Sequence, residues 1–176
     1  MGNGTDIGAV ISRTTIAATM GGLVAQATGG NFEDGAYQAS VVHLFNHEVT
    51  FDGENVSYDD DKGKQIVKYS ATSGKDGIKD QSASWKGPIP KGSYTLNPDS
   101  ISKAGFFRKF MGDWGKYRAP LTPNQSTNTY GRSGFFIHGG SSPGSAGCID
   151  MGKYDSQLFD RMKVHDGLIN VNVQYK

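Results

Sequence analysis

The amino-acid sequence predicts a mainly β fold, a β-sandwich or a mixed β-rich fold, with a few short helices. The chain contains 25 glycines in 176 residues, about twice the usual share of roughly 7%, and such an excess is typical of turn-rich β proteins. Several segments alternate apolar and polar residues with the period of a strand, and only short segments have a helical period. We therefore expect five to seven strands and two or three short helices around one core.

Strand patterns begin near residue 48 and continue to the C-terminus. The first is a hairpin in which Asp52-Gly53 forms the turn between two alternating segments. Pro88 and Pro90 disfavour a helix and precede another strand. Asp155 supplies the negative charge expected at the start of a helix. Further strands are expected at 65–71, 93–96, 135–137 and 168–175, and helices at 101–110 and 154–164.

Residues 1–47 differ from the rest in being rich in glycine and alanine, so we divide the chain into this leader and a domain at 48–176. Within the leader, Ile11 to Met20 is expected to form a helix that ends at Gly21-Gly22. A second helix is expected from Asp34 to Phe45.

Composition and charge argue against several functions. The net charge of +1 gives no electrostatic reason to expect nucleic-acid binding or stable membrane insertion. The N-terminus lacks the pattern of a signal peptide, and the apolar residues of 7–27 are interrupted too often to span a membrane. One cysteine excludes an intramolecular disulfide and is too few for the usual zinc spacings. His43 and His47 are four residues apart, which would place both on one helix face. They suggest either a metal pair or residues with a solvated or capping role, and no third ligand is evident. We expect neither a metal nor a cofactor.

The stretch from Gly131 to Met151 concentrates the chemistry of the chain. An apolar strand leads into His138, and a glycine-rich loop follows and ends at Cys148, the only cysteine. A lone cysteine is often a small buried hydrophobic residue. Here the glycines that let the loop fold back favour a nucleophile and its base, because a thiol with an ordinary pKa of about 8.5 needs a base to react at neutral pH.

Two motifs carry a family resemblance. Phe136-Ile137-His138-Gly139 followed by Ser145-Ala146-Gly147-Cys148-Ile149 resembles the active-site signature of L,D-transpeptidases of the YkuD type, and the turn from Gly87 to Tyr94 resembles an element before a strand in that family. The resemblance covers residues 48–176 and implies the L,D-transpeptidase-like β fold. Three departures, namely the short His–Cys gap, Ala146 and Asp150, resemble L,D-transpeptidase-like effectors of type VI secretion.

This resemblance implies acyl transfer on the peptide stems of peptidoglycan. Cys148 would attack the carbonyl between the third stem residue and D-alanine, with His138 as base and then acid. Water as acceptor would give an L,D-carboxypeptidase, a D-amino acid would give exchange, and a stem amine would give a cross-link. Backbone N–H groups of the loop formed by Ser145, Ala146 and Gly147 are candidates for the oxyanion hole.

Other residues near the motif are candidates for substrate binding. Arg132 and Arg118 could each hold a stem carboxylate or form a surface ion pair. Gly139 and Gly140 would leave space for the peptide, and Asp150 would pair with an arginine or with a substrate ammonium.

Two roles around His138 stay open in the sequence. A third group must orient the ring, either a backbone carbonyl or Ser145. Trp114 and Tyr130 could line a groove or belong to the core.

The leader resembles the glycine-rich region before the toxic domain of bacterial polymorphic toxins, through Gly21-Gly22-Leu23 and Gly29 to Ala36. The two resemblances together imply an antibacterial toxin delivered into the periplasm of a target bacterium by secretion machinery or as part of a larger toxin polypeptide, with a cognate immunity protein. The alternatives are another Cys-His amidase or endopeptidase of peptidoglycan, a wall-binding module without activity, or a metal or redox site.

Overall fold

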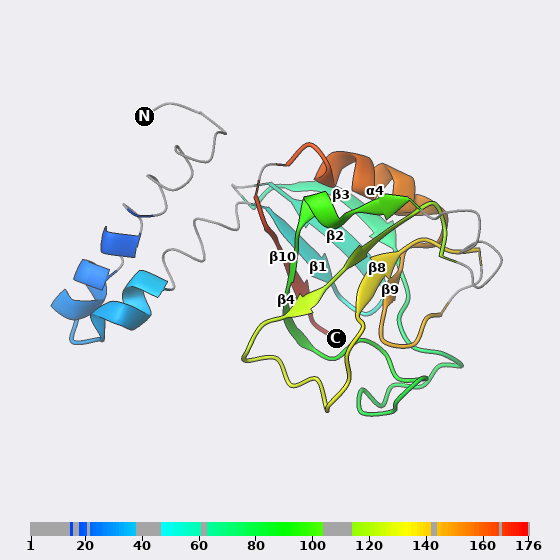
Figure 1. Ribbon diagram of the computed structural model, residues 1–176, viewed down its shortest axis with the longest axis horizontal. Helices are drawn as coiled ribbons and strands as arrows, with labels where there is room; N and C mark the ends of the chain where they lie inside the picture. Colours follow the sequence, from blue (N-terminus) through cyan, green and yellow to red (C-terminus); the bar gives the residue numbers. More distant parts are fainter. Residues whose placement is uncertain are drawn as a thin grey trace. The chain divides into compact units, whose positions relative to one another are not determined.

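The structure, a computed structural model, describes residues 15, 18–20, 22–37, 47–60, 63–103, 114–141, 144–165 and 167–175. The chain divides into two compact units, Met1–Asn46 and His47–Lys176 (Figure 1). Predictions for His43, for residues 104–110 and for most of the helix at 34–45 lie outside the described residues.

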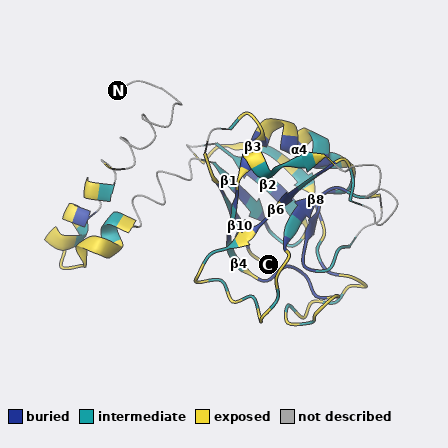
Figure 2. Ribbon diagram, viewed as in Figure 1, coloured by how far each residue is buried: buried dark blue, intermediate teal, exposed yellow. Residues whose placement is uncertain are grey.

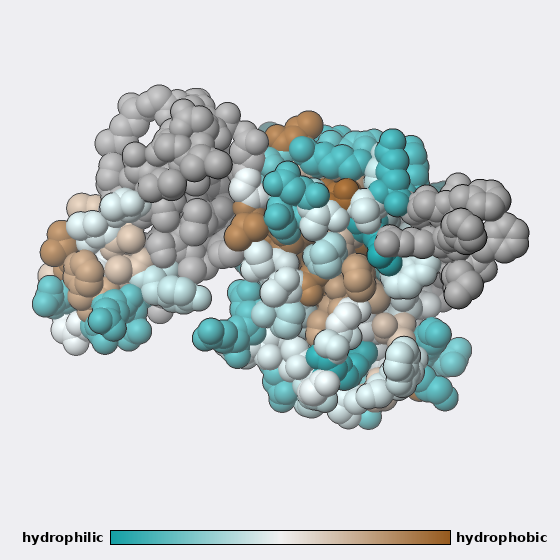
Figure 3. All heavy atoms as spheres, viewed as in Figure 1, coloured by the Kyte–Doolittle hydropathy of each residue, from teal (hydrophilic) through white to brown (hydrophobic). Residues whose placement is uncertain are grey.

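The described part of the first unit is helical at 18–20, 22–27 and 32–37. The predicted helix end at Gly21-Gly22 is wrong, because Gly22 is itself helical and the turn comes at Gly29, where φ is +86°. Gly22 has a packing role instead, since a Cβ atom there would lie 2.6 Å from the ring of Phe32. The helices expose apolar side chains, which colour this unit brown in the surface view (Figure 3).

A six-stranded sheet forms one layer of the second unit. Its order is β3-β2-β1-β10-β4-β7, with β1 and β10 parallel and the other pairs antiparallel. The predicted hairpin turn at Asp52-Gly53 joins the first two strands, and Asp52 Oδ1 accepts the N–H of Asn55 at 2.7 Å. The strands are β1 (Glu48–Phe51), β2 (Asn55–Asp59), β3 (Gln65–Ser70), β4 (Gly92–Leu96), β7 (Thr122–Pro123) and β10 (Ile169–Val173).

A four-stranded sheet of order β5-β6-β8-β9 forms a second layer, and its strands are short. Residues 101–103 were expected to begin a helix, but Ser102 and Lys103 pair with β6 as a strand, so that prediction is wrong there. The alternation signal is weak in strands of two to four residues, and the sheet pairing decides their conformation. The strands are β5 (Ser102–Lys103), β6 (Tyr117–Pro120), β8 (Phe136–His138) and β9 (Ile149–Asp150).

One hydrophobic core joins the two sheets and the helix α4 (Asp155–Met162). The ring of Tyr94 in β4 meets that of Phe135 edge-on, and Tyr117 in β6 packs on Phe159 of α4. The inward side of α4 is buried and its outer side is exposed (Figure 2). Two 3-10 turns, η1 (Pro98–Ser100) and η2 (Gly152–Tyr154), complete the described elements of this unit.

The strand-rich fold class is confirmed, and the described residues of the second unit form ten strands, more than the five to seven expected. His47 does not share a helix with His43, because it lies beside β1, with its ring 4.2 Å from that of His165 and stacked on Tyr58. Within the described ranges, no three histidine, cysteine or acidic side chains lie close enough to share a metal ion. No described helix is long and apolar enough to cross a membrane.

Candidate active site

His138 lies at the end of β8, in the middle of the four-stranded sheet. Antiparallel pairing places it opposite Arg118 of β6, and parallel pairing places it opposite Asp150 of β9. The alternate residues of these strands, Ala119, Ile137 and Ile149, are fully buried in the core. His138 therefore belongs to the face that turns away from the core, and its own side chain is only 2% exposed.

Cys148 ends the glycine-rich loop and directly precedes β9. Since Ile137 pairs with Ile149, continuing the parallel register by one residue brings Cys148 opposite Phe136. The Phe136 N–H donates to the thiol of Cys148, so Cys148 lies beside β8, the strand that ends at His138. The sheet thus brings together the two residues on which the sequence analysis centred.

The hydrogen bonds of His138 fix its tautomer. Nδ1 lies 2.6 Å from the carbonyl oxygen of Gly139, which can only accept, so Nδ1 carries the proton. In the neutral form of the ring, Nε2 is then the nitrogen without a proton; it is buried and has no hydrogen-bond partner in the described part of the chain. Of the two orienting groups that the sequence left open, the structure selects the backbone carbonyl. An oriented ring with an unsatisfied basic nitrogen is what general-base catalysis requires.

The Cys148 side chain is 3% exposed, and burial raises the pKa of its thiol. A hydrogen bond from the Phe136 N–H, the Ser145 side chain and the charge of Arg132 act in the opposite direction, and the Asp150 charge adds to the increase. Since the net pKa is raised, the thiol is protonated at neutral pH and becomes nucleophilic only when a base removes its proton. The Ser145 side chain contacts Cys148, and the described hydrogen bonds give it none to His138.

Trp114 covers this face of the sheet. Its ring lies 4.9 Å from that of His138 and 5.9 Å from that of Phe136, between centroids. The Arg118 guanidinium stacks above Trp114 and Phe136, at 5.3 and 5.0 Å from their centroids. Arg118 therefore supports the aromatic cover, a role that was not among its two expected ones, a ligand for a stem carboxylate or a partner in a surface ion pair. Trp114 shields the histidine from water.

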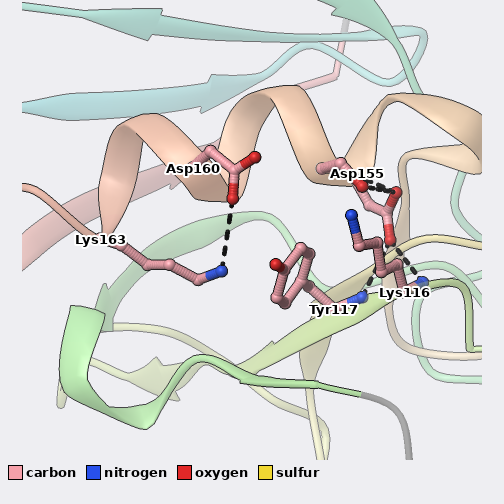
Figure 4. A network of polar contacts seen from close by, with 6 residues as sticks. Lys116, Tyr117, Asp155, Asp160 and Lys163 are labelled. Atoms are coloured by element: carbon pink, nitrogen blue, oxygen red, sulfur yellow. Dashed lines mark hydrogen bonds and ion pairs between the residues drawn. The ribbon is translucent and has the colours of Figure 1, made fainter.

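Asp155, the first residue of α4, fixes the chain that flanks His138. Its Oδ2 accepts the N–H groups of Lys116 and Tyr117, at 2.6 and 2.9 Å, immediately before and at the start of β6 (Figure 4). A Cβ atom on Gly139 would lie 2.5 Å from this carboxyl group. The expectation that Gly139 leaves space for substrate is therefore wrong, because Asp155 fills that space. The Gly140 N–H donates to the carbonyl oxygen of Gly152. The Gly152 N–H in turn donates to Oδ1 of Asp150 at 2.8 Å.

Arg132 joins two loops. Its Nη1 donates to the carbonyls of Gln81 and Pro88, at 2.5 and 2.7 Å, and its Nη2 donates to Gly87 at 2.9 Å. Three of its five N–H groups are thus occupied by backbone carbonyls, and the described residues form no ion pair with it. Its main observed role is to hold residues 81–88 beside the cysteine loop, although it was expected to hold a substrate carboxylate.

The backbone N–H groups of the cysteine loop are only partly available to an oxyanion. The Gly147 N–H donates to the Gly87 carbonyl at 2.9 Å, so the prediction that it faces the substrate is wrong in this conformation. The Cys148 N–H lies 3.4 Å from the Ser145 carbonyl, a long and weak contact. Ala146 and Cys148 are therefore the better candidates for donors.

Cys148 is one of the residues that line a pocket of about 440 Å³. Trp114, whose ring covers His138, lines it as well. His138 itself does not line the pocket, and neither do Arg118, Gly139, Gly140, Asp150 and Tyr130. No local pattern in the sequence indicated Lys75 or Trp85, which come from loops distant in the chain. The described residues that line the pocket are Lys75, Ser84, Trp85, Trp114, Arg132, Ser133, Gly134, Ser145, Ala146, Gly147 and Cys148.

The family model described as Tlde1 domain matches residues 67–172, more than half of the chain and all of the site. The chain belongs to the Tlde1 family. This is a family of type VI L,D-transpeptidase effectors, so the chain is a peptidoglycan-modifying, L,D-transpeptidase-like effector. The family match confirms the effector-type resemblance that the sequence carries, whereas the toxin-like leader and the delivery route of this chain stay predictions.

Among solved structures, the Tlde1 chain is similar to Mycobacterium tuberculosis L,D-transpeptidase 1, with 17% identity and a TM-score of 0.42 over 74% of this chain. The alignment spans 60% of that enzyme. The catalytic domain of the Enterococcus faecium L,D-transpeptidase aligns at 16% identity and a TM-score of 0.43, over 73% of this chain and 95% of that one. An L,D-transpeptidase of Xylanimonas cellulosilytica aligns at 15% identity and 0.43, over 90% and 78%. No curated protein matches the sequence.

Proposed function

We propose that this Tlde1 domain is a cysteine acyltransferase that removes or replaces the terminal D-alanine of peptidoglycan tetrapeptide stems. The observation that carries the proposal is the buried Nε2 of His138, which has no hydrogen-bond partner among the described residues while Nδ1 contacts the Gly139 carbonyl. His138 ends β8, which pairs with β9, and Cys148 directly precedes β9. A protonated thiol beside an oriented neutral imidazole is the resting state of a nucleophile with a general base.

The reaction follows from these two groups. Nε2 of His138 takes the thiol proton while Sγ of Cys148 bonds to the carbonyl carbon between the third stem residue and D-alanine. The C–N bond then breaks, and the imidazolium returns the proton to the leaving D-alanine amine, which leaves a thioester on Cys148. Water or the amine of a D-amino acid attacks this thioester, again with His138 as base, and the C–S bond breaks to regenerate the thiol.

Muropeptides incubated with the purified protein test this reaction. Mass spectrometry should show tetrapeptides converted to tripeptides, or to tetrapeptides with a new terminal residue when a D-amino acid is added. Cys148→Ala should abolish both products, by about 10³-fold or more, and His138→Gln should do nearly the same. Lys79→Met, at an exposed residue outside the pocket lining, serves as a control for handling and purity. Cleavage at another bond would assign an amidase or endopeptidase, and full activity of Cys148→Ala would overturn the proposal.

The cellular role is proposed on the same basis. An effector that removes D-alanine depletes the donors for cross-linking, so we expect toxicity only in the compartment that holds peptidoglycan. Expression with a periplasmic signal should arrest growth, whereas cytoplasmic expression and periplasmic Cys148→Ala should not. If the Cys148→Ala variant binds the wall and is as toxic as the wild type, the protein acts as a binding module and not as an enzyme. An immunity protein and secretion machinery are the expected partners.

A further inference from the structure

The cations near Cys148 differ in what they contact. Arg132 donates three N–H groups to backbone carbonyls, and Arg118 stacks on two aromatic rings and does not line the pocket. Lys75 lines the pocket, its side chain is exposed, and no described acidic side chain forms an ion pair with it. The described lining contains no aspartate or glutamate. Within the described residues, Lys75 is therefore a cation of this pocket that no carboxylate holds in an ion pair.

Trp85 is the second unusual residue of the same wall. Its side chain is 86% exposed, although a tryptophan of this size is usually mostly buried. Its φ is +64°, a left-handed conformation that bulky residues rarely adopt and that costs of order a few RT. Such strain at the rim of a pocket indicates a side chain held out for a ligand.

Backbone contacts place these two residues on adjoining loops. The Lys75 N–H donates to the Lys86 carbonyl at 2.8 Å, one residue beyond Trp85. The Gly74 N–H donates to the Ser145 carbonyl at 3.0 Å, which ties the same loop to the loop of the nucleophile. Lys75, Trp85 and Cys148 therefore line one pocket on loops that backbone hydrogen bonds hold together.

We propose that Lys75 and Trp85 form the subsite for the D-amino acid that leaves or enters the acyl-enzyme. Lys75 binds the α-carboxylate, and the Trp85 ring packs against the side chain of the D-amino acid. This inference rests on the proposed function and adds the selectivity of its leaving group and acceptor. In the exchange step the amine nitrogen bonds to the thioester carbon, the C–S bond breaks, and the amine proton passes through His138 to the thiolate.

Paired substrates test the carboxylate contact. A disaccharide tetrapeptide that ends in D-alanine is compared with the same compound ending in D-alanine amide, and kcat/KM is measured for each. We expect the wild type to prefer the acid by about tenfold or more, since a hydrogen bond to a charged group contributes that much. Lys75→Met should lose this preference but keep its rate on the amide. Lys79→Met, on the same loop but outside the pocket lining, should keep the preference.

Each outcome of this comparison is decisive. A wild type that cleaves the two substrates equally, or a Lys75→Met variant that keeps the full preference, overturns the role of Lys75 while the proposed function stands. Cleavage of neither substrate by the wild type overturns the proposed function and the subsite with it. The amide rate of Lys75→Met is the internal control for folding.

Competition between acceptors tests Trp85. With D-methionine and glycine supplied together, the ratio of the two exchange products should fall several-fold in Trp85→Ala and be retained in Trp85→Tyr, which keeps an aromatic surface. An unchanged ratio in Trp85→Ala would remove this residue from the subsite.

Discussion

The six-stranded sheet and the four-stranded sheet share one core but are held by different interactions. Most strands of the first have four to six residues, and β1, β2, β4 and β10 bury alternate apolar side chains, which specifies their register. The strands of the second have two to four residues and form few ladder contacts. Polar side chains hold this second sheet and the loops around it: Asp155 binds the start of β6, and Arg132 binds residues 81–88.

The residues that mainly stabilise the fold and the residues of the candidate active site lie in different parts of the second unit. The candidate nucleophile and base lie on or next to the four-stranded sheet, and the described residues that line the pocket all come from loops and not from the strands of either sheet. Because the strands of the four-stranded sheet are short, hydrogen bonds of individual side chains fix the position of the loops around the site. Substitutions in the first sheet should therefore change mainly stability, and substitutions among the polar contacts should change activity as well.

The largest effect on stability is expected in the six-stranded sheet. Ile169 in β10 is fully buried, and Ile169→Ala should lower the free energy of unfolding by about 3 kcal/mol, with Ile169→Val losing about 1 kcal/mol. Denaturant unfolding measures both, and the folded variants should keep the wild-type kcat/KM on muropeptides. A loss of activity of more than tenfold in folded Ile169→Val would contradict the separation of the two sheets.

Asp155→Ala should affect both properties. It leaves the N–H groups of Lys116, Tyr117 and Ser156 without their acceptor, and we expect a loss of about 2–3 kcal/mol in unfolding free energy. Because Asp155 also packs against Gly139, whose carbonyl orients His138, kcat should fall by at least about tenfold. Asp160→Ala is the matched control on the same helix, since its contact with Lys163 is exposed (Figure 4) and should contribute little. Equal effects of the two variants would contradict the role of Asp155.

Arg132→Met should lower the free energy of unfolding modestly and lower kcat/KM strongly. It removes three hydrogen bonds to Gln81, Gly87 and Pro88, for which we expect about 1–2 kcal/mol. The freed loop carries Trp85 and accepts the Gly147 N–H, so kcat/KM should fall by about tenfold or more. Hydrogen exchange should locate the loosening at 81–88 and leave β1 and β10 protected. Uniform loss of protection would show that Arg132 supports the whole fold.

The smallest expected effect concerns the pKa of the Cys148 thiol, which is measured on the folded protein. Because burial raises the pKa of Cys148, the rate of alkylation by iodoacetamide should rise with pH at a higher inflection than the roughly 8.5 of an ordinary thiol. The positive charge of Arg132 lowers this pKa, so Arg132→Met should move the inflection further upward. The protein unfolded in denaturant gives the reference value. An inflection below that reference would indicate a thiolate–imidazolium pair already formed without substrate.

Local patterns predicted much of the fold. The hairpin at Asp52-Gly53, the strands at β3, β4, β8 and β10 and the helix that begins near Asp155 follow from alternation, turn residues and helical period, and each of these signals lies within a few neighbouring residues. Where the signal was weak, the predictions were wrong. Residues 102–103 pair as β5 because β6 is available beside them, and Gly22 continues a helix because Phe32 packs there.

The sequence by itself predicted the Cys148–His138 pair, since a strand that ends in histidine and a glycine loop that ends in cysteine are continuous in the chain. Only the tertiary structure decided what surrounds that pair. In the folded chain the Gly139 carbonyl orients His138, and Asp155 occupies the space beside Gly139. Arg132 donates hydrogen bonds to backbone carbonyls up to 51 residues away in the sequence. The tertiary structure also brings Lys75 and Trp85 to the pocket. These contacts join residues that are distant in sequence, and no local period encodes which of several cations or glycines will meet a given partner once the sheets have packed.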